Sequence, residues 1–168
     1  MILVIGGSGF VGLSLLEILA DQYPLASIVA TYRDSLPSLD LPNITWRKID
    51  VSKTTDIDKL FELNDFRIVI HLANYSYFDE SDNFAMINMV KLNIDGTAAL
   101  LKSIEQSRVE HFVYVSSSAA IEYFSGNFPD NSLGAPSSFY GLTKSVAESL
   151  VVNQKKTDMT YCILRPAA

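Results

Sequence analysis

Tyr140 and Lys144 are four positions apart, in a stretch whose apolar pattern predicts a helix from Phe139 to about Lys155. Residues at positions i and i+4 share one face of a helix, so the lysine ammonium would lie beside the phenol. A nearby positive charge favours phenolate and lowers the pKa of the phenol, which suits a tyrosine to general acid or base work. Such a pair alone is more often a solvated helix face, so its surroundings must support the chemistry.

A run of serines, SSSA at 116–119, follows the apolar segment HFVYV, which predicts a strand. A serine hydroxyl at a strand end can hydrogen-bond a substrate carbonyl or alcohol. If the serines and the Tyr140 helix meet at one edge of a sheet, they could together transfer a proton to or from a substrate oxygen.

Three glycines, Gly6, Gly9 and Gly12, span the junction between a predicted strand at 2–5 and a predicted helix from Phe10 to Ala20. At the first strand-to-helix junction, this spacing predicts a dinucleotide site: one glycine turns the chain, one admits the pyrophosphate, and one lets the helix pack on the sheet. Backbone amides at the helix N-terminus, including those of Phe10 and Val11, would then face the phosphates. A purely structural tight turn is the alternative.

The second predicted strand, SIVATYR at 27–33, should end near the adenosine ribose. Tyr32 stands about where a cofactor-selecting acid would, and Arg33 follows directly. Because an arginine can pair with a 2′-phosphate and stack on adenine, the sequence favours NADP over NAD. Asp34 could instead turn inward, and a solvent-facing Arg33 is also possible.

The remaining pattern alternates strands with helices, which predicts one doubly wound α/β domain over residues 1–168 with a parallel sheet covered on both faces. A long helix is expected from about Asp82 to Ser107, with Asn93 inside it and Gly96 as a weak point. Ser52 is expected to cap a short helix at 56–63. Residues 124–138 read as a loop. The other predicted strands are 44–50, 67–73, 111–117 and 159–165.

The composition excludes several other classes of protein. Thirteen basic against nineteen acidic residues give a net charge of −6, which argues against nonspecific binding to nucleic acid or anionic membranes. The single cysteine, Cys162, rules out an intramolecular disulfide and is expected to be buried.

His71 is expected to be a hydrogen-bonded strand-end histidine and His111 a strand-start residue, so a metal site has little support. No apolar run approaches the roughly 20 residues of a membrane span, and no signal precedes the first strand, so a cytoplasmic protein is expected.

Seven segments in order resemble the extended short-chain dehydrogenase/reductases, also called the NAD-dependent epimerase/dehydratase family. The matching text is GGSGFVG (6–12), DV (50–51), VIHLAN (69–74), NIDGT (93–97), FVYVSSSAA (112–120), YGLTKSVAE (140–148) and LRP (164–166). The resemblance implies a Rossmann-like sheet of about six strands in the order 3-2-1-4-5-6. It also implies an NAD(P)-dependent oxidoreductase, epimerase or dehydratase acting on a nucleotide-sugar or a similar hydroxy or keto substrate.

The resemblance also assigns roles to individual residues. Tyr140 resembles the family's general acid/base, Lys144 its pKa-lowering and ribose-binding partner, and Ser118 the hydroxyl that orients substrate, with Ser117 as the alternative. Asn93 resembles a helix asparagine that supports the site, and Arg165 opens a segment that leads toward the nicotinamide. Residues that resemble adenine, ribose or phosphate contacts are Asp50, Val51, Leu72 and Ala73.

The chain departs from the family pattern in two places. Tyr123 and Gly126 are displaced from a usual aromatic-glycine segment after the serines, and the chain stops at LRPAA, where members continue into a region that covers the substrate. The resemblance therefore implies that this C-terminal substrate region is absent from 1–168. A net NADPH-dependent reductase and a non-catalytic dinucleotide-binding module remain alternatives, and a homodimer is expected from the family alone.

Overall fold

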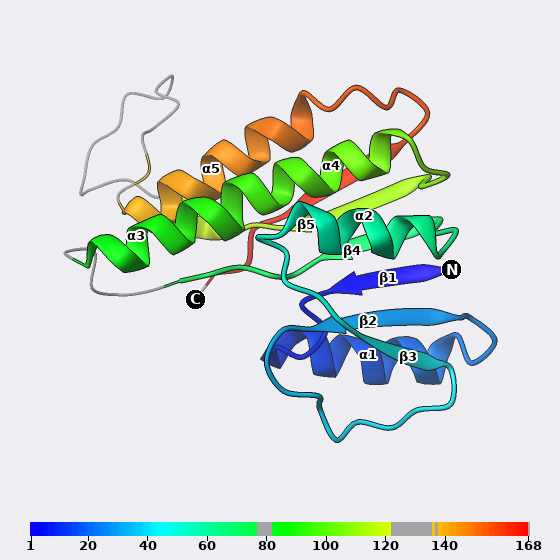
Figure 1. Cartoon of the computed structure of the whole chain (residues 1–168). Helices are drawn as coiled ribbons and strands as arrows, with labels where there is room; N and C mark the ends of the chain where they lie inside the picture. Colours follow the sequence, from blue (N-terminus) through cyan, green and yellow to red (C-terminus); the bar gives the residue numbers. More distant parts are fainter. Residues whose placement is uncertain (77–81, 122–135, 137, 168) are drawn as a thin grey trace.

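The computed structural model describes residues 1–76, 82–121, 136 and 138–167, and these form one six-stranded sheet with helices on both faces (Figure 1). All strand pairs are parallel, and the order β3-β2-β1-β4-β5-β6 confirms the predicted topology. The order reverses between β1 and β4, and ligands of open α/β sheets bind at such a switch point. The strands are β1 (Ile2–Ile5), β2 (Ile28–Tyr32), β3 (Ile44–Lys48), β4 (Ile68–His71), β5 (His111–Val115) and β6 (Thr160–Leu164).

The helices divide unequally between the two faces of the sheet. In Figure 1, α1 lies on one side, and α2, α3, α4 and α5 lie on the other. Side chains alternate along β1: Leu3 and Ile5 join the larger core with residues of α2, α4 and α5, whereas Val4 packs with Leu16 of α1. The helical segments are α1 (Phe10–Gln22), α2 (Thr54–Glu62), α3 (Asn83–Met89), the π-helix η1 (Val90–Gly96), α4 (Thr97–Glu105), the 3-10 helix η2 (Ser118–Ala120) and α5 (Phe139–Val152).

The long helix predicted between Asp82 and Ser107 forms as a continuous α3–η1–α4 run, with a π-helical turn at its centre. Asp82 caps it, since its Oδ1 accepts from the Phe84 amide at 2.8 Å. Gly96 is the last residue of the π-helix, and an added Cβ there would lie 2.7 Å from the Val51 side chain. The predicted weak point is thus the place where this helix approaches the loop after β3. Single π-helical turns within α-helices are frequent at functional sites.

Two local predictions are wrong. Ser52 does not cap α2: its hydroxyl donates to Asp50 Oδ1 at 2.7 Å, and the helix begins after Lys53 without a side-chain cap. Cys162 is exposed rather than buried. It lies on β6, which is an edge strand of this sheet, so an apolar sequence there is not covered on both sides.

Candidate active site and dinucleotide cleft

The three glycines of the first turn meet three different spatial demands. Gly6 has φ +82°, and a Cβ there would lie 2.6 Å from the Ala73 nitrogen, so this turn needs glycine. Gly12 lies against the same turn, where its Cβ would meet the Gly6 oxygen at 2.5 Å. Gly9 differs, because among the described residues its Cβ would meet only that oxygen, at 3.4 Å. The space above Gly9 is open, as close approach of a ligand requires.

The turn is anchored by a residue that the sequence analysis did not single out. Thr31, almost fully buried near the end of β2, accepts the Gly6 amide on its hydroxyl at 3.0 Å. Its carbonyl accepts the Ser8 amide at 3.3 Å. β2 therefore fixes the backbone of the glycine turn through one side chain and one carbonyl.

A cleft of about 720 Å³ opens above this turn, at the carboxyl ends of β1, β2 and β4. Of the predicted cofactor contacts, those that line it are Gly6, Gly9, Arg33, Val51, Leu72 and Ala73. Gly12 lies beneath the turn, and Asp50 lines an adjoining hollow with Arg33. The side chains of Phe10 and Val11 are exposed in the first turn of α1 and do not line the cleft. Any contact from these two residues would therefore come from the backbone.

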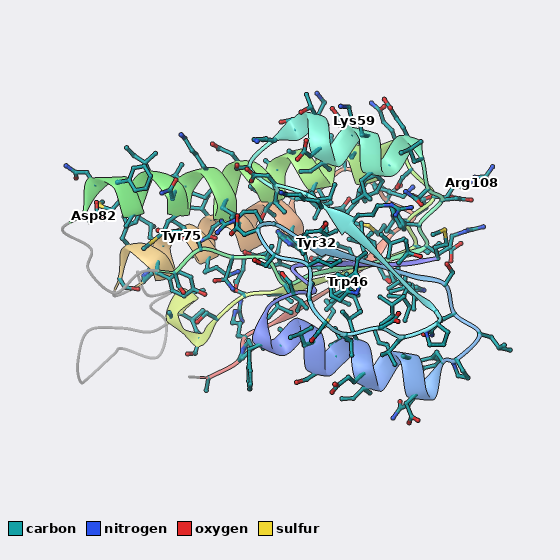
Figure 2. The ribbon with its side chains drawn as sticks, turned by 60° about the horizontal axis from the view of Figure 1, so that its bottom comes forward. Tyr32, Trp46, Lys59, Tyr75, Asp82 and Arg108 are labelled. Carbon is teal, nitrogen blue, oxygen red and sulfur yellow. The ribbon has the colours of Figure 1, made fainter. Side chains whose placement is uncertain are left out.

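At the end of the cleft that follows β2, Arg33 has a partner in its own loop. Its Nε donates to Asp34 Oδ2 at 2.9 Å, and both side chains are at least half exposed. Tyr32, at the position expected for a selecting acid, packs edge-on against Trp46 with ring centroids 6.4 Å apart (Figure 2). The wall of the cleft thus holds a cation and a carboxylate side by side.

Asp50 is held as a carboxylate beside that wall. Burial alone would raise its pKa, but hydrogen bonds from the Ser52 amide and hydroxyl and the charges of Lys53 and Arg33 hold the pKa below its ordinary value. A charged acceptor is therefore available at this end of the cleft.

Asn93 is almost fully buried in η1 and connects the exit of β4 to α5. Its side-chain oxygen accepts the Tyr75 amide at 2.8 Å, and its Nδ2 donates to the Tyr75 carbonyl at 2.9 Å and to Thr143 Oγ1 at 3.0 Å. The Thr143 hydroxyl donates to the Tyr140 carbonyl at 2.7 Å. Figure 2 shows Tyr75 close to the ribbon of α5. Asn93 therefore braces the start of α5 through Thr143, which the sequence analysis did not identify.

The serine run and Tyr140 meet at the carboxyl end of β5. The Ser117 hydroxyl accepts the Ala119 amide at 3.2 Å and hydrogen-bonds Tyr140, while Ser118 begins η2. The contact depends on Gly141, another residue that the sequence analysis did not single out, because a Cβ there would lie 2.2 Å from the Ala119 carbonyl oxygen. Glycine at this position lets α5 start directly against η2.

The structure does not show the lowering of the Tyr140 pKa that was expected from Lys144. Burial raises the pKa of Tyr140, and the hydrogen bond with Ser117 opposes that rise. Lys144 is 1% exposed: its Nζ donates to the Val115 carbonyl at 2.8 Å and lies 4.4 Å from the centre of the Tyr114 ring. Burial lowers the pKa of Lys144 to about 7, and Glu148 opposes that fall. The Lys144 amine thus lies at the carboxyl end of β5, where burial disfavours its charged form.

The two histidines occupy the places expected for structural residues. His71 ends β4, is fully buried, and lies 3.2 Å from the Thr97 hydroxyl; burial lowers its pKa to about 3, so it is neutral. His111 begins β5. In the described ranges, no group of three or more His, Cys, Asp or Glu side chains could hold a metal ion. Nor does any helix in these ranges combine the length and apolar character needed to cross a membrane.

Among curated proteins, the chain is similar to dTDP-D-glucose 4,6-dehydratase of Homo sapiens, with 29% identity over 162 residues, which is 89% of this chain and 45% of the human enzyme. It is also similar to the decarboxylating sterol-4-alpha-carboxylate 3-dehydrogenase of Saccharomyces cerevisiae, with 28% identity over 99% of this chain and 50% of the yeast enzyme. The chain thus spans about half the length of these relatives.

Among solved structures, the chain is similar to UDP-glucuronic acid 4-epimerase from Bacillus cereus in complex with UDP-glucuronic acid and NAD. The TM-score is 0.80 and the identity 26%, over 98% of this chain and 55% of the epimerase. The NAD dependent epimerase/dehydratase family matches residues 2–168. The glycine turn, the sheet order and this match over nearly the whole length identify the chain as a member of the NAD-dependent epimerase/dehydratase family.

Proposed function

We propose that this chain is the dinucleotide-binding and proton-transfer part of an NAD(P)-dependent enzyme that acts on a nucleotide-sugar or a similar hydroxy or keto substrate. The supporting observation is the convergence of two sites at one edge of the sheet. The cleft above the glycine turn lies at the ends of β1, β2 and β4, and the Ser117–Tyr140 contact lies at the end of the neighbouring β5. The similar proteins are named as an epimerase, a dehydratase and a dehydrogenase.

The residues of the cleft fit a dinucleotide. Gly9 leaves open the space that a pyrophosphate would need, and amides at the start of α1 can donate to its oxygens. Asp50 and Val51 would contact the adenine, and Leu72 and Ala73 the ribose and phosphates. When bound, the nicotinamide supplies the acceptor or donor of a hydride. The similar Bacillus cereus epimerase was solved with NAD.

The chain's own residues would handle the proton. In the proposal, Tyr140 takes it from, or returns it to, the substrate hydroxyl. Lys144 holds ribose hydroxyls and favours the phenolate, a serine of the run orients the substrate oxygen, and Asn93 keeps the start of α5 in place. Burial raises the pKa of Tyr140 in the chain without cofactor, so phenolate formation would need a further stabilising charge, and the proposal assigns that charge to the Lys144 ammonium.

We propose that Arg33 favours NADP over NAD and that the neighbouring Asp34 weakens this preference. The guanidinium can pair with a 2′-phosphate, but the Asp34 carboxylate bonded to it would repel the same group. Calorimetric titrations with NAD⁺ and NADP⁺ should show that Arg33→Ala weakens NADP⁺ binding about tenfold and leaves NAD⁺ binding almost unchanged. The matched variant Asp34→Asn should strengthen NADP⁺ binding instead. An unchanged ratio of the two affinities in Arg33→Ala would contradict the proposal.

The serine that orients substrate can be identified by a pair of alanine variants. Ser118 is the residue that the resemblance assigns, whereas Ser117 is the one bonded to Tyr140. Ser118→Ala is expected to lower kcat about a hundredfold, because a substrate oxygen loses its donor in the transition state. Ser117→Ala is expected to shift the pH dependence of kcat to higher pH, because the Tyr140 pKa rises when this hydrogen bond is lost. Reversed effects would exchange the two roles.

The overall proposal is tested by NAD(P)⁺ titration followed by addition of nucleotide-sugars, with the absorbance of the reduced cofactor as the readout. Binding with substrate-dependent reduction supports the enzyme. Binding without reduction by any substrate favours a non-catalytic dinucleotide-binding module, and net consumption of NADPH favours a reductase. The expected homodimer and cytoplasmic location remain predictions.

A further inference from the structure

A charged pair adjoins the proposed proton-transfer residues without being part of them. Glu148 is four residues beyond Lys144 on α5 and is 8% exposed. Both of its carboxylate oxygens are engaged by Arg165: Nε donates to Oε1 at 2.8 Å, and Nη2 donates to Oε2 at 2.6 Å. Two parallel bonds fix orientation as well as distance, so the Glu148 carboxylate is held in one place.

Arg165 is itself anchored to the serine run. The Ser116 amide donates to the Leu164 carbonyl at 2.7 Å, and the Ser118 amide donates to the Pro166 carbonyl at 3.0 Å. The arginine backbone therefore sits between two hydrogen bonds that extend the β5–β6 ladder past the ends of both strands. Through Glu148, this segment is tied to α5 two turns beyond Tyr140. The serine run and α5 are thus joined at two points, one at Tyr140 and one at Glu148.

The titratable and charged groups around Lys144 come from β4, β5 and α5, and from the segment after β6 through its contact with Glu148. His71 of β4 is neutral, and Tyr114 of β5 has a pKa raised above its ordinary value, so it is neutral as well. On α5 itself, Tyr140 also has a raised pKa. After β6, Arg165 carries a positive charge, which Glu148 compensates. Among the described residues that face Lys144, Glu148 therefore supplies the negative charge.

Glu148 is kept ionised by its surroundings. Burial disfavours the carboxylate, but the hydrogen bonds from Arg165 and the charges of Arg165 and Lys144 hold the pKa of Glu148 below its ordinary value. The carboxylate is consequently charged throughout the range in which Lys144 titrates.

We propose that Glu148 is a positioning residue whose carboxylate favours the ammonium form of Lys144, which lies one helical turn before it on α5 and donates to the Val115 carbonyl. Its effect on proton transfer rests on the proposed function. Its effect on Lys144 does not, and can be measured without a cofactor. The resemblance implies that the segment starting at Arg165 leads toward the nicotinamide. In the structure, the Arg165 guanidinium binds Glu148 on α5.

The direction of the effect follows from the charges. Burial lowers the pKa of Lys144 to about 7, and Glu148 raises it against that burial. In Glu148→Gln the negative charge is gone and the positive charge of Arg165 is no longer compensated. Both changes disfavour the ammonium, so the titration midpoint should fall by about one pH unit.

The test is an ¹⁵N NMR titration of the Lys144 ammonium in the chain without cofactor, with its resonance assigned by its loss in Lys144→Met. Glu148→Gln should shift the midpoint down, whereas Glu148→Asp, which keeps the charge, should stay closer to the parent. The matched control Glu17→Gln removes an exposed carboxylate from α1 and should leave the midpoint unchanged. Equal midpoints in Glu148→Gln and the parent would overturn the proposal, as would a downward shift of equal size in Glu148→Asp and Glu148→Gln.

Arg165→Gln distinguishes charge from folding. It breaks the pair but leaves the carboxylate, so the Lys144 midpoint should not fall; a fall equal to that of Glu148→Gln would show that the ion pair acts only through structure and would overturn the proposal. In parallel, NAD⁺ affinity measured against pH should decline at a pH about one unit lower in Glu148→Gln than in the parent. If the midpoint shifts but no variant binds dinucleotide, the proposed function fails while the role of Glu148 stands.

Discussion

Tyr140→Phe is expected to lower turnover by about 10²- to 10⁴-fold while dinucleotide affinity changes less than about threefold. The hydroxyl is the group that would exchange a proton with substrate, and in the structure it meets the Ser117 hydroxyl at the end of β5. Phenylalanine keeps the ring and its packing at the start of α5 and removes only that oxygen. The measurement pairs steady-state kinetics with a calorimetric titration of NAD⁺ on the same preparation.

The matched control is Tyr23→Phe, which removes an exposed phenol from the C-terminal end of α1, outside the lining of the cleft. It should leave both turnover and affinity unchanged. If Tyr140→Phe retains more than about a tenth of the parent turnover, Tyr140 is not the general acid or base of the reaction. If turnover and affinity fall together, the residue acts by holding the cofactor site rather than by moving a proton.

The sheet could be predicted from the sequence because its inner strands are continuous apolar runs bounded by glycines, prolines and polar residues. ILVI at β1 and the stretch ending at His71 have one plausible environment, which is burial on both faces. The prediction failed for Cys162, where the same kind of sequence lies on an edge strand. An apolar pattern reports what a strand could bury, whereas its position in the sheet decides what is buried.

The types of site residue could be predicted from motif spacing, but their electrostatics could not. The spacing places Tyr140 and Lys144 on one helical face, yet it does not show that Lys144 is seated under Val115 with a pKa lowered to about 7. That value results from burial between β5 and α5, which is a property of packing. Thr31, Thr143, Gly141 and Glu148 were missed for the same reason, since each acts on a segment distant in the sequence.

One signal for Glu148 was present in the sequence. Tyr140, Lys144 and Glu148 recur every four residues, which predicts that they share one face of the helix. In the structure, Lys144 and Glu148 are buried on α5. A carboxylate on a face that also buries a lysine needs a partner, and a buried charge without one would cost several kcal/mol. Identifying that partner as Arg165 required the three-dimensional structure.

Gly12→Ala is expected to destabilise the fold, whereas Gly9→Ala is expected to weaken dinucleotide binding. A Cβ on Gly12 would lie 2.5 Å from the Gly6 oxygen and 2.6 Å from the Gly7 oxygen, both of them backbone atoms that cannot rotate away. We expect the free energy of unfolding to fall by about 3 kcal/mol, because overpacking of this kind outweighs the gain of about 1 kcal/mol from replacing a helical glycine by alanine. Thermal and urea denaturation measure this loss.

Gly9→Ala should instead fold almost normally and bind poorly. Gly9 has φ −76°, which alanine adopts readily, and its Cβ would touch only one atom, at the ordinary distance of 3.4 Å. The change in the free energy of unfolding should stay within about 1 kcal/mol, the usual cost of alanine at a helix N-cap. NAD⁺ affinity should fall at least about tenfold, because the new methyl group occupies the space into which a pyrophosphate would come.

The contrast between the two variants separates the two reasons for a glycine-rich turn. Gly12 is required by the contact between α1 and the turn, and this demand exists with or without a ligand. Gly9 meets no such demand in the structure, so its sequence position is explained by something that approaches the turn from the cleft. If Gly9→Ala binds NAD⁺ as tightly as the parent, the phosphates do not pass over this glycine, and the proposed cofactor placement fails even though the fold stands. Weak binding by a stably folded Gly9→Ala would support that placement directly.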